Sequence, residues 1–236
     1  MAERPIFTPS LEGPSLVLTH SIKFDWFPGM AVSQSQKSIA SLHEAFSKQT
    51  NIPQVLEIST KSKLPVGVKL SAFNLMIKTI RYEQEFSVEC AYQASKVFDR
   101  GGPFVDLLKR KSIDAKRDPR LNQSGRLTKY RFFGADWKLE PRTAFYDWLY
   151  INALHKHHTL AQAVLQYMAF SDIAFNPERS INCQAYAAAL YVSLVKRNLL
   201  TKELIKDRDT YLAVVGGMKV SNSHEDTITQ DNIPFE

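Results

Sequence analysis

The spacing of hydrophobic and polar positions predicts a chain of short strands and more numerous helices. Apolar residues recur every three to four positions in several windows, which is typical of amphipathic or buried helices. We predict helices over residues 33–48, 87–98, 104–111, 112–118, 142–155, 159–168, 181–196 and 201–215. Windows of strand composition lie at 54–59, 66–80 and 130–133. This pattern indicates a single α+β domain that is predominantly helical, with a small β element.

The two ends of the chain differ in composition from the middle. Residues 1–32 are rich in proline and aromatic residues, so we expect an irregular arm with one or two short strands, packed on the body by its aromatics. This arm and the helix that follows it make up residues 1–50, and the main domain is expected to span 51–220. Residues 222–236 contain four acids, no lysine or arginine and few apolar residues, so we expect a mobile acidic tail from residue 221.

The overall composition is that of an ordinary globular protein. The chain has 236 residues, of which 44% are hydrophobic, enough to bury a sizeable core. It lacks an apolar run of about 18 residues and a signal-peptide pattern, so we expect a cytoplasmic protein without a membrane partner. Cys90 and Cys183 both fall in apolar helical patterns. In that compartment we expect buried free thiols rather than a disulfide.

Positive charge is concentrated in one segment. The formal net charge is +6, and residues 100–142 contain twelve lysines and arginines against five acidic residues, an excess of seven. The remainder of the chain is therefore close to neutral. Such a segment can contact the phosphates of a nucleic acid or a nucleotide, or it can form a solvated basic surface. Both interpretations stay open at this point.

The stretch with the strongest chemical signal is Ser87–Phe98. Most of its positions are apolar, as on a buried helix, but Glu89, Gln93 and Lys96 interrupt the pattern. Their spacings of four and three would place them on one face of the helix. Buried polar groups without partners cost ~2–7 kcal/mol each, so such a row requires partners or a ligand. A half-exposed amphipathic helix would show the same pattern.

Common catalytic and cofactor motifs are absent from the sequence. It contains no P-loop, no dinucleotide-binding glycine pattern, no zinc-protease motif and no nucleophile elbow. Three histidines lie close together at 155, 157 and 158. They fall where one predicted helix ends and the next begins, a position that favours histidine for its interaction with the helix end. We therefore predict no metal site and no cofactor.

Several further stretches place Glu89, Gln93 and Lys96 in a wider pattern. The chain contains, in order, Leu-Ser-Ala-Phe-Asn-Leu at 70–75, Glu-Cys-Ala-Tyr-Gln-Ala-Ser-Lys at 89–96, Ser-Ile-Asp-Ala-Lys-Arg at 112–117 and Ser-Ile-Asn-Cys-Gln-Ala at 180–185. This succession resembles the NADAR family from about residue 66 to 195. The helix around 145–154 and the Trp-Phe-Pro-Gly at 26–29 are similar to the subgroup encoded beside DarT-type toxins, in which the NADAR protein is the antitoxin.

The resemblance implies an N-glycosidase or ADP-ribosyl glycohydrolase. For this subgroup the substrate would be ADP-ribose attached to guanine in DNA or in a nucleoside, and the functional partner a cognate ADP-ribosyltransferase toxin. Glu89 would stabilise the cationic sugar or act as acid and base, since cleavage of an N-glycosidic bond develops positive charge on the sugar. Lys96 would hold the diphosphate or, if neutral, attack the anomeric carbon and form a Schiff base. Lys61, Lys63 and Lys69 are rival amines.

The remaining expected site residues would bind the substrate. They are Ser71, Phe73, Asn74, Tyr92, Gln93, Lys116, Arg117, Trp137 and Asn182. The amides would contact ribose hydroxyls, Trp137 would stack on a base, and the cations would contact the pyrophosphate or the DNA backbone. Compared with the family pattern, Cys90 replaces a frequent histidine, Ala72 replaces an asparagine, and residues 175–180 replace a Trp-Gly-x-Gly element. A toxin- or nucleic-acid-binding antitoxin without activity, and an N-glycosidase of a small phosphorylated metabolite, are the alternative functions.

Overall fold

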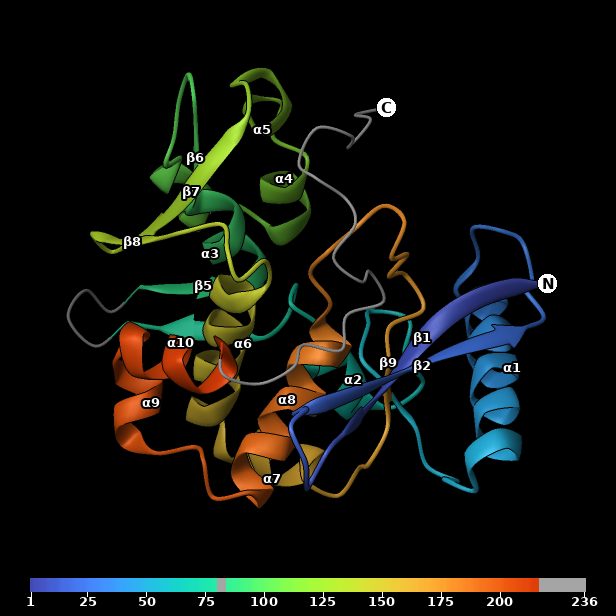
Figure 1. Ribbon diagram of the computed structural model, residues 1–236. Coiled ribbons are helices and arrows are strands. Elements are labelled where there is room, and N and C mark those ends of the chain that lie inside the picture. Colours follow the sequence, from blue (N-terminus) through green and yellow to red (C-terminus); the bar gives the residue numbers. More distant parts are fainter. Residues whose placement is uncertain (80–83, 217–236) are drawn as a thin grey trace.

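A mixed four-stranded sheet brings together strands from distant parts of the sequence (Figure 1). The computed structural model describes residues 1–79 and 84–216. The strand order is β2-β1-β9-β3, with the bounds β1 Ala2–Pro9, β2 Val17–Phe24, β3 Leu56–Glu57 and β9 Phe170–Ser171. β1 runs antiparallel to both β2 and β9, and β3 runs parallel to β9.

The N-terminal arm is more regular than expected. The expected strands are present, but the two of them are eight residues long and pair over their full length, where the sequence indicated an irregular arm with one or two short strands. The reason is a small core of its own, in which Ile6 and Ile22 of the hairpin pack with Leu42 and Phe46 of helix α1, Val32–Thr50. The helix predicted over 33–48 is confirmed, and the hairpin is a layer between α1 and the rest of the molecule (Figure 1).

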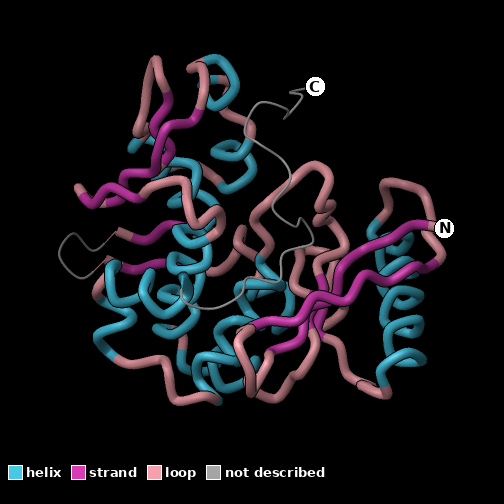
Figure 2. Tube along the Cα trace, viewed as in Figure 1, coloured by secondary structure: helices cyan, strands magenta, loops and turns pink. Residues whose placement is uncertain are grey.

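The helices form the centre of the molecule, and two smaller sheets lie outside them (Figure 2). One pairs β4 Met76–Lys78 with β5 Glu85–Ser87, and the other has the order β6-β7-β8, with β6 Lys96–Phe98, β7 Leu127–Phe132 and β8 Ala135–Trp137. The central helices are α3 Val88–Ala94, α6 Ala144–Lys156 and α8 Gln184–Lys196. Shorter helices complete the fold: α2 Pro65–Leu70, the 3-10 helix η1 Val105–Lys109, α4 Ser112–Lys116, α5 Arg120–Gln123, α7 His158–Val164, α9 Lys202–Lys206 and α10 Arg208–Gly216.

One main core joins these elements. Helices α3, α6 and α8 are buried over most of their surface and share a cluster of hydrophobic side chains with the sheets. The expected single, predominantly helical α+β domain is confirmed. Within the described residues no helix is long and apolar enough to cross a membrane. The division at residues 50 and 220 stays a prediction, and the expected acidic tail 221–236 lies outside the described residues.

Several predicted element boundaries were wrong. The helix expected over 87–98 ends at Ala94, where Ser95 Oγ donates to the carbonyl of Ala91 at 2.7 Å, and residues 96–98 pair with β7 instead. The first half of the strand expected over 66–80 is helix α2, which starts at Pro65, a favoured first helical position. The last predicted helix is two short helices separated at Asp207.

Gly67 of α2 marks the closest approach between this helix and the sheet. A Cβ at this position would lie 2.1 Å from the carbonyl oxygen of Glu57 and 2.4 Å from Ser62 Oγ. We predict that Gly67→Ala destabilises the fold by about 1–3 kcal/mol or more, because α2 must move away from β3. Urea denaturation measures the change in the free energy of unfolding. Gly216→Ala is the matched control, since its Cβ would meet no atom of the described residues within 4 Å. Equal effects of the two substitutions would contradict the packing described.

Candidate active site

The start of helix α3 is held by hydrogen bonds from two other segments. Ser87 caps the helix, its Oγ accepting from the Cys90 backbone N–H at 3.1 Å. Ser112, the first residue of α4, places its Oγ 2.8 Å from both Ser87 Oγ and the carbonyl oxygen of Phe73. The backbone N–H of Glu89 donates to the carbonyl of Ala72 at 2.9 Å. The turn at 71–74, α3 and α4 therefore form one rigid frame.

Glu89 and Gln93 lie on one face of α3, as the spacing predicted. Both side chains are buried, and Gln93 Nε2 donates to Glu89 Oε1 at 2.9 Å. The other amide atom, Gln93 Oε1, is buried without a hydrogen-bond partner among the described residues. Buried polar atoms are nearly always paired, so an acceptor left unpaired beside a buried carboxylate indicates a place where a polar ligand donates.

Lys96 lies on β6 and not on α3, which corrects the helical face proposed from the sequence. The side chain is half-buried, and its Nζ lies 4.8 Å from the centroid of the Tyr92 ring. Burial lowers the pKa of Lys96 to about 8, an effect that the Glu89 carboxylate opposes and the Lys116 cation reinforces. Glu89, Lys96 and Lys116 therefore act on one another at one site, and a substantial fraction of the Lys96 amine is neutral near physiological pH.

A set of buried tyrosines encloses this site. Tyr92 OH lies 3.0 Å from Tyr130 OH and accepts a hydrogen bond from Asn182 Nδ2 at 2.7 Å. Tyr146 contacts the Tyr92 ring edge-on, with 5.2 Å between the ring centroids. Burial raises the pKa of Tyr92 and of Tyr146, and the Glu89 carboxylate raises both further. Asn182 Oδ1 is a second buried acceptor without a partner among the described residues.

Asp172 is a buried acid that the sequence reasoning missed. It follows strand β9, and its Oδ2 accepts from Gln184 Nε2 at 3.0 Å. Gln184 Oε1 in turn accepts from the backbone N–H of Ala72 at 2.7 Å, which ties Asp172 to the frame of the site. Burial, and then the Glu57 carboxyl, raise the pKa of Asp172 to about 7, while Lys116 lowers it. The signal in the sequence was an acid two positions after the apolar residues 168–170.

Comparison with known proteins identifies the family. The family profile described as DarT1-associated NADAR antitoxin matches residues 2–225, nearly the whole chain. The chain belongs to this NADAR antitoxin family. The resemblance inferred from the sequence is confirmed, and the protein is an antitoxin paired with a DarT toxin. A sequence comparison with curated proteins gave no match.

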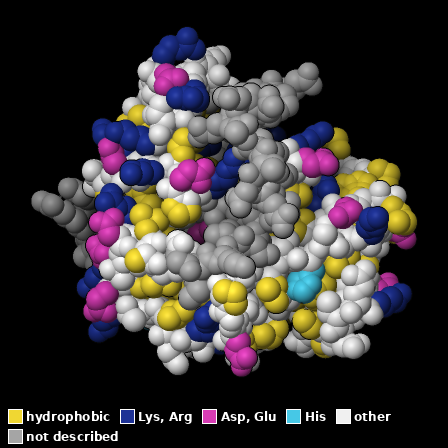
Figure 3. Space-filling model, viewed as in Figure 1, with side chains coloured by type: hydrophobic (Ala, Val, Ile, Leu, Met, Phe, Trp, Pro, Cys, Tyr) yellow, Lys and Arg dark blue, Asp and Glu magenta, His cyan; other side chains and the backbone are white. Residues whose placement is uncertain are grey.

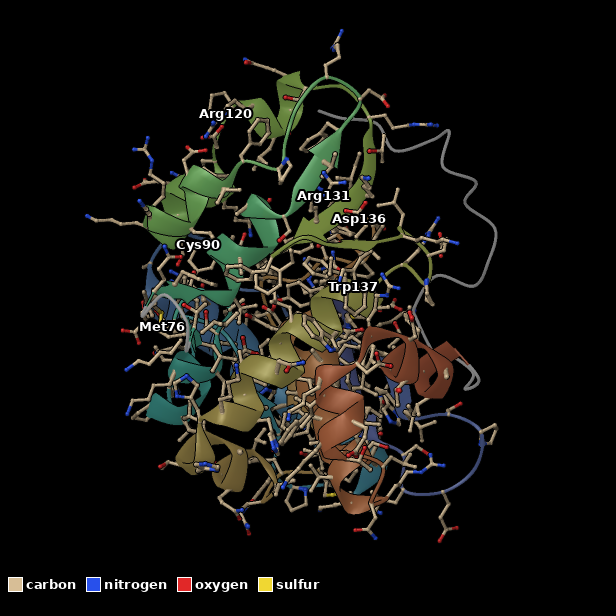
Figure 4. All side chains as sticks on the ribbon, turned by 90° about the vertical axis from the view of Figure 1, so that its left-hand side faces the viewer. Met76, Cys90, Arg120, Arg131, Asp136 and Trp137 are labelled. Carbon is tan, nitrogen blue, oxygen red and sulfur yellow. The ribbon has the colours of Figure 1, made fainter. Side chains whose placement is uncertain are left out.

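In this antitoxin two of the residues expected at the site are held by contacts elsewhere. Asn74 is exposed, and its Nδ2 donates to the carbonyl of Val68 at 2.8 Å at the end of α2. Trp137 is buried in the aromatic core, with its ring 5.5 Å from Phe145 and 5.0 Å from Trp148 between centroids (Figure 4). Neither placement supports the expected contact with a ribose or a base.

The other expected residues divide into two groups. Ser71 is buried, and its Oγ accepts from the backbone N–H of Phe73 at 3.3 Å, so it shapes the turn at 71–74. Lys116 is exposed at the site, with its Nζ 5.4 Å from the centroid of the Phe73 ring. Arg117 follows it and is also exposed. Phe73 and Lys116 therefore lie next to each other, and the charge of Lys116 acts on the buried Asp172 and on Lys96.

Ion pairs within the positive segment 100–142 reduce its net field. Arg120 pairs with Asp106 and Asp118 at 2.7 and 2.8 Å. Asp136 pairs with Arg131, which lies next to it in Figure 4, and with Lys129 at 2.6 Å. In the part of the chain that the structure describes, no group of three or more His, Cys, Asp or Glu side chains is placed to hold a metal ion. Of the segment's cations, Lys116 is the one that acts electrostatically on Lys96 and Asp172.

The charges around Lys96 predict opposite effects of two substitutions on its pKa. Lys116→Met should raise the pKa of Lys96, because a neighbouring cation is removed, and Glu89→Gln should lower it, because a neighbouring anion is removed. NMR titration of isotopically labelled lysine side chains measures both shifts, with Lys96→Arg identifying the resonance. Lys206→Met on α9 is the control and should leave the pKa unchanged. Shifts of the same sign for the two substitutions would contradict this arrangement.

Proposed function

We propose that this antitoxin is an ADP-ribosyl glycohydrolase that removes ADP-ribose from guanine bases of DNA. The observation that carries the proposal is the meeting of a buried carboxylate, Glu89, with an amine of lowered pKa, Lys96, beside the unpaired acceptors of Gln93 and Asn182. Pairing with a DarT toxin supports the choice of substrate, because an antitoxin of this kind can act by reversing the modification that the toxin makes.

Glu89 is assigned to the charge that develops on the sugar. As the bond between the anomeric carbon and the guanine nitrogen lengthens, the ribose becomes cationic like an oxocarbenium ion. A carboxylate in a site of low polarity stabilises that charge far more than a carboxylate in water would. The hydrogen bond from Gln93 holds the Glu89 carboxylate in one orientation. Gln93 Oε1 and Asn182 Oδ1 are then available to accept hydrogen bonds from ribose hydroxyls.

Lys96 is assigned to nucleophilic attack. The neutral amine attacks the anomeric carbon, the bond to guanine breaks, and the guanine nitrogen takes up a proton. Loss of a proton from the amine and opening of the ribose ring give a Schiff base. Water then hydrolyses the Schiff base, releasing ADP-ribose and restoring the amine. The lowered pKa of Lys96 supports this role, because only the neutral amine is a nucleophile.

Asp172 and Lys116 are assigned supporting roles. With its pKa raised to about 7 by burial, Asp172 can hold or release a proton near neutral pH. Its hydrogen bond to Gln184 makes it a positioning residue for the turn at 71–74 as well. Lys116 is exposed next to this cluster, where its charge can contact the pyrophosphate of ADP-ribose.

The decisive experiment incubates the purified protein with an oligonucleotide that carries ADP-ribosylated guanine and follows its mass. We expect the wild type to release ADP-ribose, and Glu89→Gln to slow the release by about 10²- to 10⁴-fold. Lys96→Arg should have an effect at least as large, because a guanidinium stays protonated. Lys206→Met is the control with full activity. Retention of the adduct by the wild type would refute the proposed activity and leave an antitoxin that acts by binding.

Reductive trapping tests the nucleophile. Addition of borohydride during turnover should convert the Schiff base into a stable secondary amine, which adds the mass of the opened ADP-ribose to the protein. Peptide mapping should place this mass on Lys96, and Lys96→Arg should abolish it. An adduct on Lys61, Lys63 or Lys69 would instead assign the nucleophile to one of these rival amines.

A further inference from the structure

One edge of the four-stranded sheet carries Asp172 of the candidate active site and an aromatic loop. Because β1 runs antiparallel to β2 and β9, its first residues lie beside the carboxyl ends of these strands, and β3 ends at the same edge. Three segments leave the sheet at this edge (Figure 1). Asp172 and residues 174–183 follow β9, residues 59–64 follow β3, and residues 25–31 follow β2. The sheet thus holds the loop 25–31 on the same side of the molecule as the site.

The loop 25–31, called here the aromatic loop, exposes large apolar side chains. Trp26 is 43% exposed, Phe27 38% and Met30 fully exposed. The backbone under them is fixed by α1, since the N–H of Phe27 donates to Ser38 Oγ at 2.9 Å and the N–H of Asp25 to Ser41 Oγ at 3.1 Å. Aromatic rings that are exposed yet held by an anchored backbone lose little entropy on binding a partner.

Arg4 connects the aromatic loop to the segment that leads into the site. Its guanidinium carbon lies 5.7 Å from the centroid of the Trp26 ring, and its Nε is buried without a partner among the described residues. Burial lowers the pKa of Arg4. The charge of Glu178 raises this pKa and the charge of Arg179 lowers it further, so both residues lie close enough to act on Arg4. The same segment continues to Asn182, which contacts Tyr92.

Further cations border the aromatic loop. Gln36 Nε2 of α1 contacts the carbonyl of Lys61 at 3.4 Å, which places the loop between β3 and α2 beside the first turns of α1. This loop carries Lys61 and Lys63, the latter exposed. In Figure 3 hydrophobic and Lys/Arg side chains lie next to one another over this end of the molecule, and acidic groups are interspersed. Aromatic faces next to cations are the combination that binds single-stranded nucleic acid, whose bases stack and whose phosphates pair with the cations.

We propose that the aromatic loop and Arg4 bind single-stranded DNA next to the modified guanine, with bases stacked on Trp26 and Phe27. This inference rests on the proposed function and makes its substrate a DNA strand rather than a free nucleoside. The strand would run from the site past 178–179, with phosphates near Arg4 and Lys63. A duplex would hide the base faces that the two rings need, so single-stranded DNA is the occupant that these side chains suit.

Binding of an unmodified oligonucleotide tests the loop without any chemistry. Fluorescence anisotropy with a labelled single-stranded 12-mer should show that Trp26→Ala weakens binding about tenfold, as expected for loss of one base–aromatic stack. Trp26→Phe should restore most of the affinity, because it keeps a ring. Arg4→Gln should weaken binding and reduce its salt dependence. Phe133→Ala is the matched control, since Phe133 is an exposed aromatic residue in the turn between β7 and β8.

A second assay separates this inference from the proposed function. The ratio of kcat/KM for an ADP-ribosylated oligonucleotide to kcat/KM for ADP-ribosylated guanosine should fall about tenfold in Trp26→Ala and stay constant in Phe133→Ala. If the wild type hydrolyses neither substrate, the proposed function fails. The anisotropy measurement still shows whether the aromatic loop binds single-stranded DNA. Oligonucleotide binding by Trp26→Ala as tight as that of the wild type would overturn the inference. Loss of binding to the purified toxin in the same variant would then assign the loop to a protein partner.

Discussion

A carboxylate inside an apolar core is the constraint on which the rest of the site depends. Glu89 lies on a helix whose every residue is buried, so its charge must be met by polar or charged groups nearby. Gln93 supplies a hydrogen bond from the same helix, and Lys96 supplies positive charge from the strand that follows. The helix ends before Lys96, so this lysine lies on β6, where the Glu89 charge still acts on its pKa.

The sheet contributes to the same site through a chain of hydrogen bonds. Asp172 at the end of β9 accepts from Gln184, and Gln184 accepts from the backbone of Ala72, whose carbonyl holds the start of α3. Glu57 lies on β3, and Asp172 directly follows the adjacent parallel strand β9. Burial raises the pKa of both carboxyls, and the charge of Glu57 raises the pKa of Asp172 further. Strands, helix and turn are thus coupled through polar groups, and displacement of one of them would leave buried groups unpaired.

Much of this arrangement could be predicted, and the errors share a cause. The periodicity of 142–155 and 181–196 located two central helices because long apolar repeats are unambiguous. The segments 66–80 and 87–98 were assigned one element each, although each contains a helix and a strand. Windows of about six residues carry too little periodicity to separate the two. Trp137 was expected at the site, but packing against Phe145 and Trp148 placed it in the core.

The sequence was sufficient for the fold class and for the shared face of Glu89 and Gln93, because these follow from periodicity and local spacing along one chain. It was sufficient for the family through the resemblance of its motifs. It did not reveal Asp172, the proximity of Lys96 and Lys116, or the position of Trp26 and Asp172 at the same edge of the sheet. These depend on how distant strands pair, since the antiparallel run of β1 between β2 and β9 decides which loops meet. The lowered pKa of Lys96 arises in the same way, because burial and neighbouring charge are properties of the packed molecule and not of its order of residues.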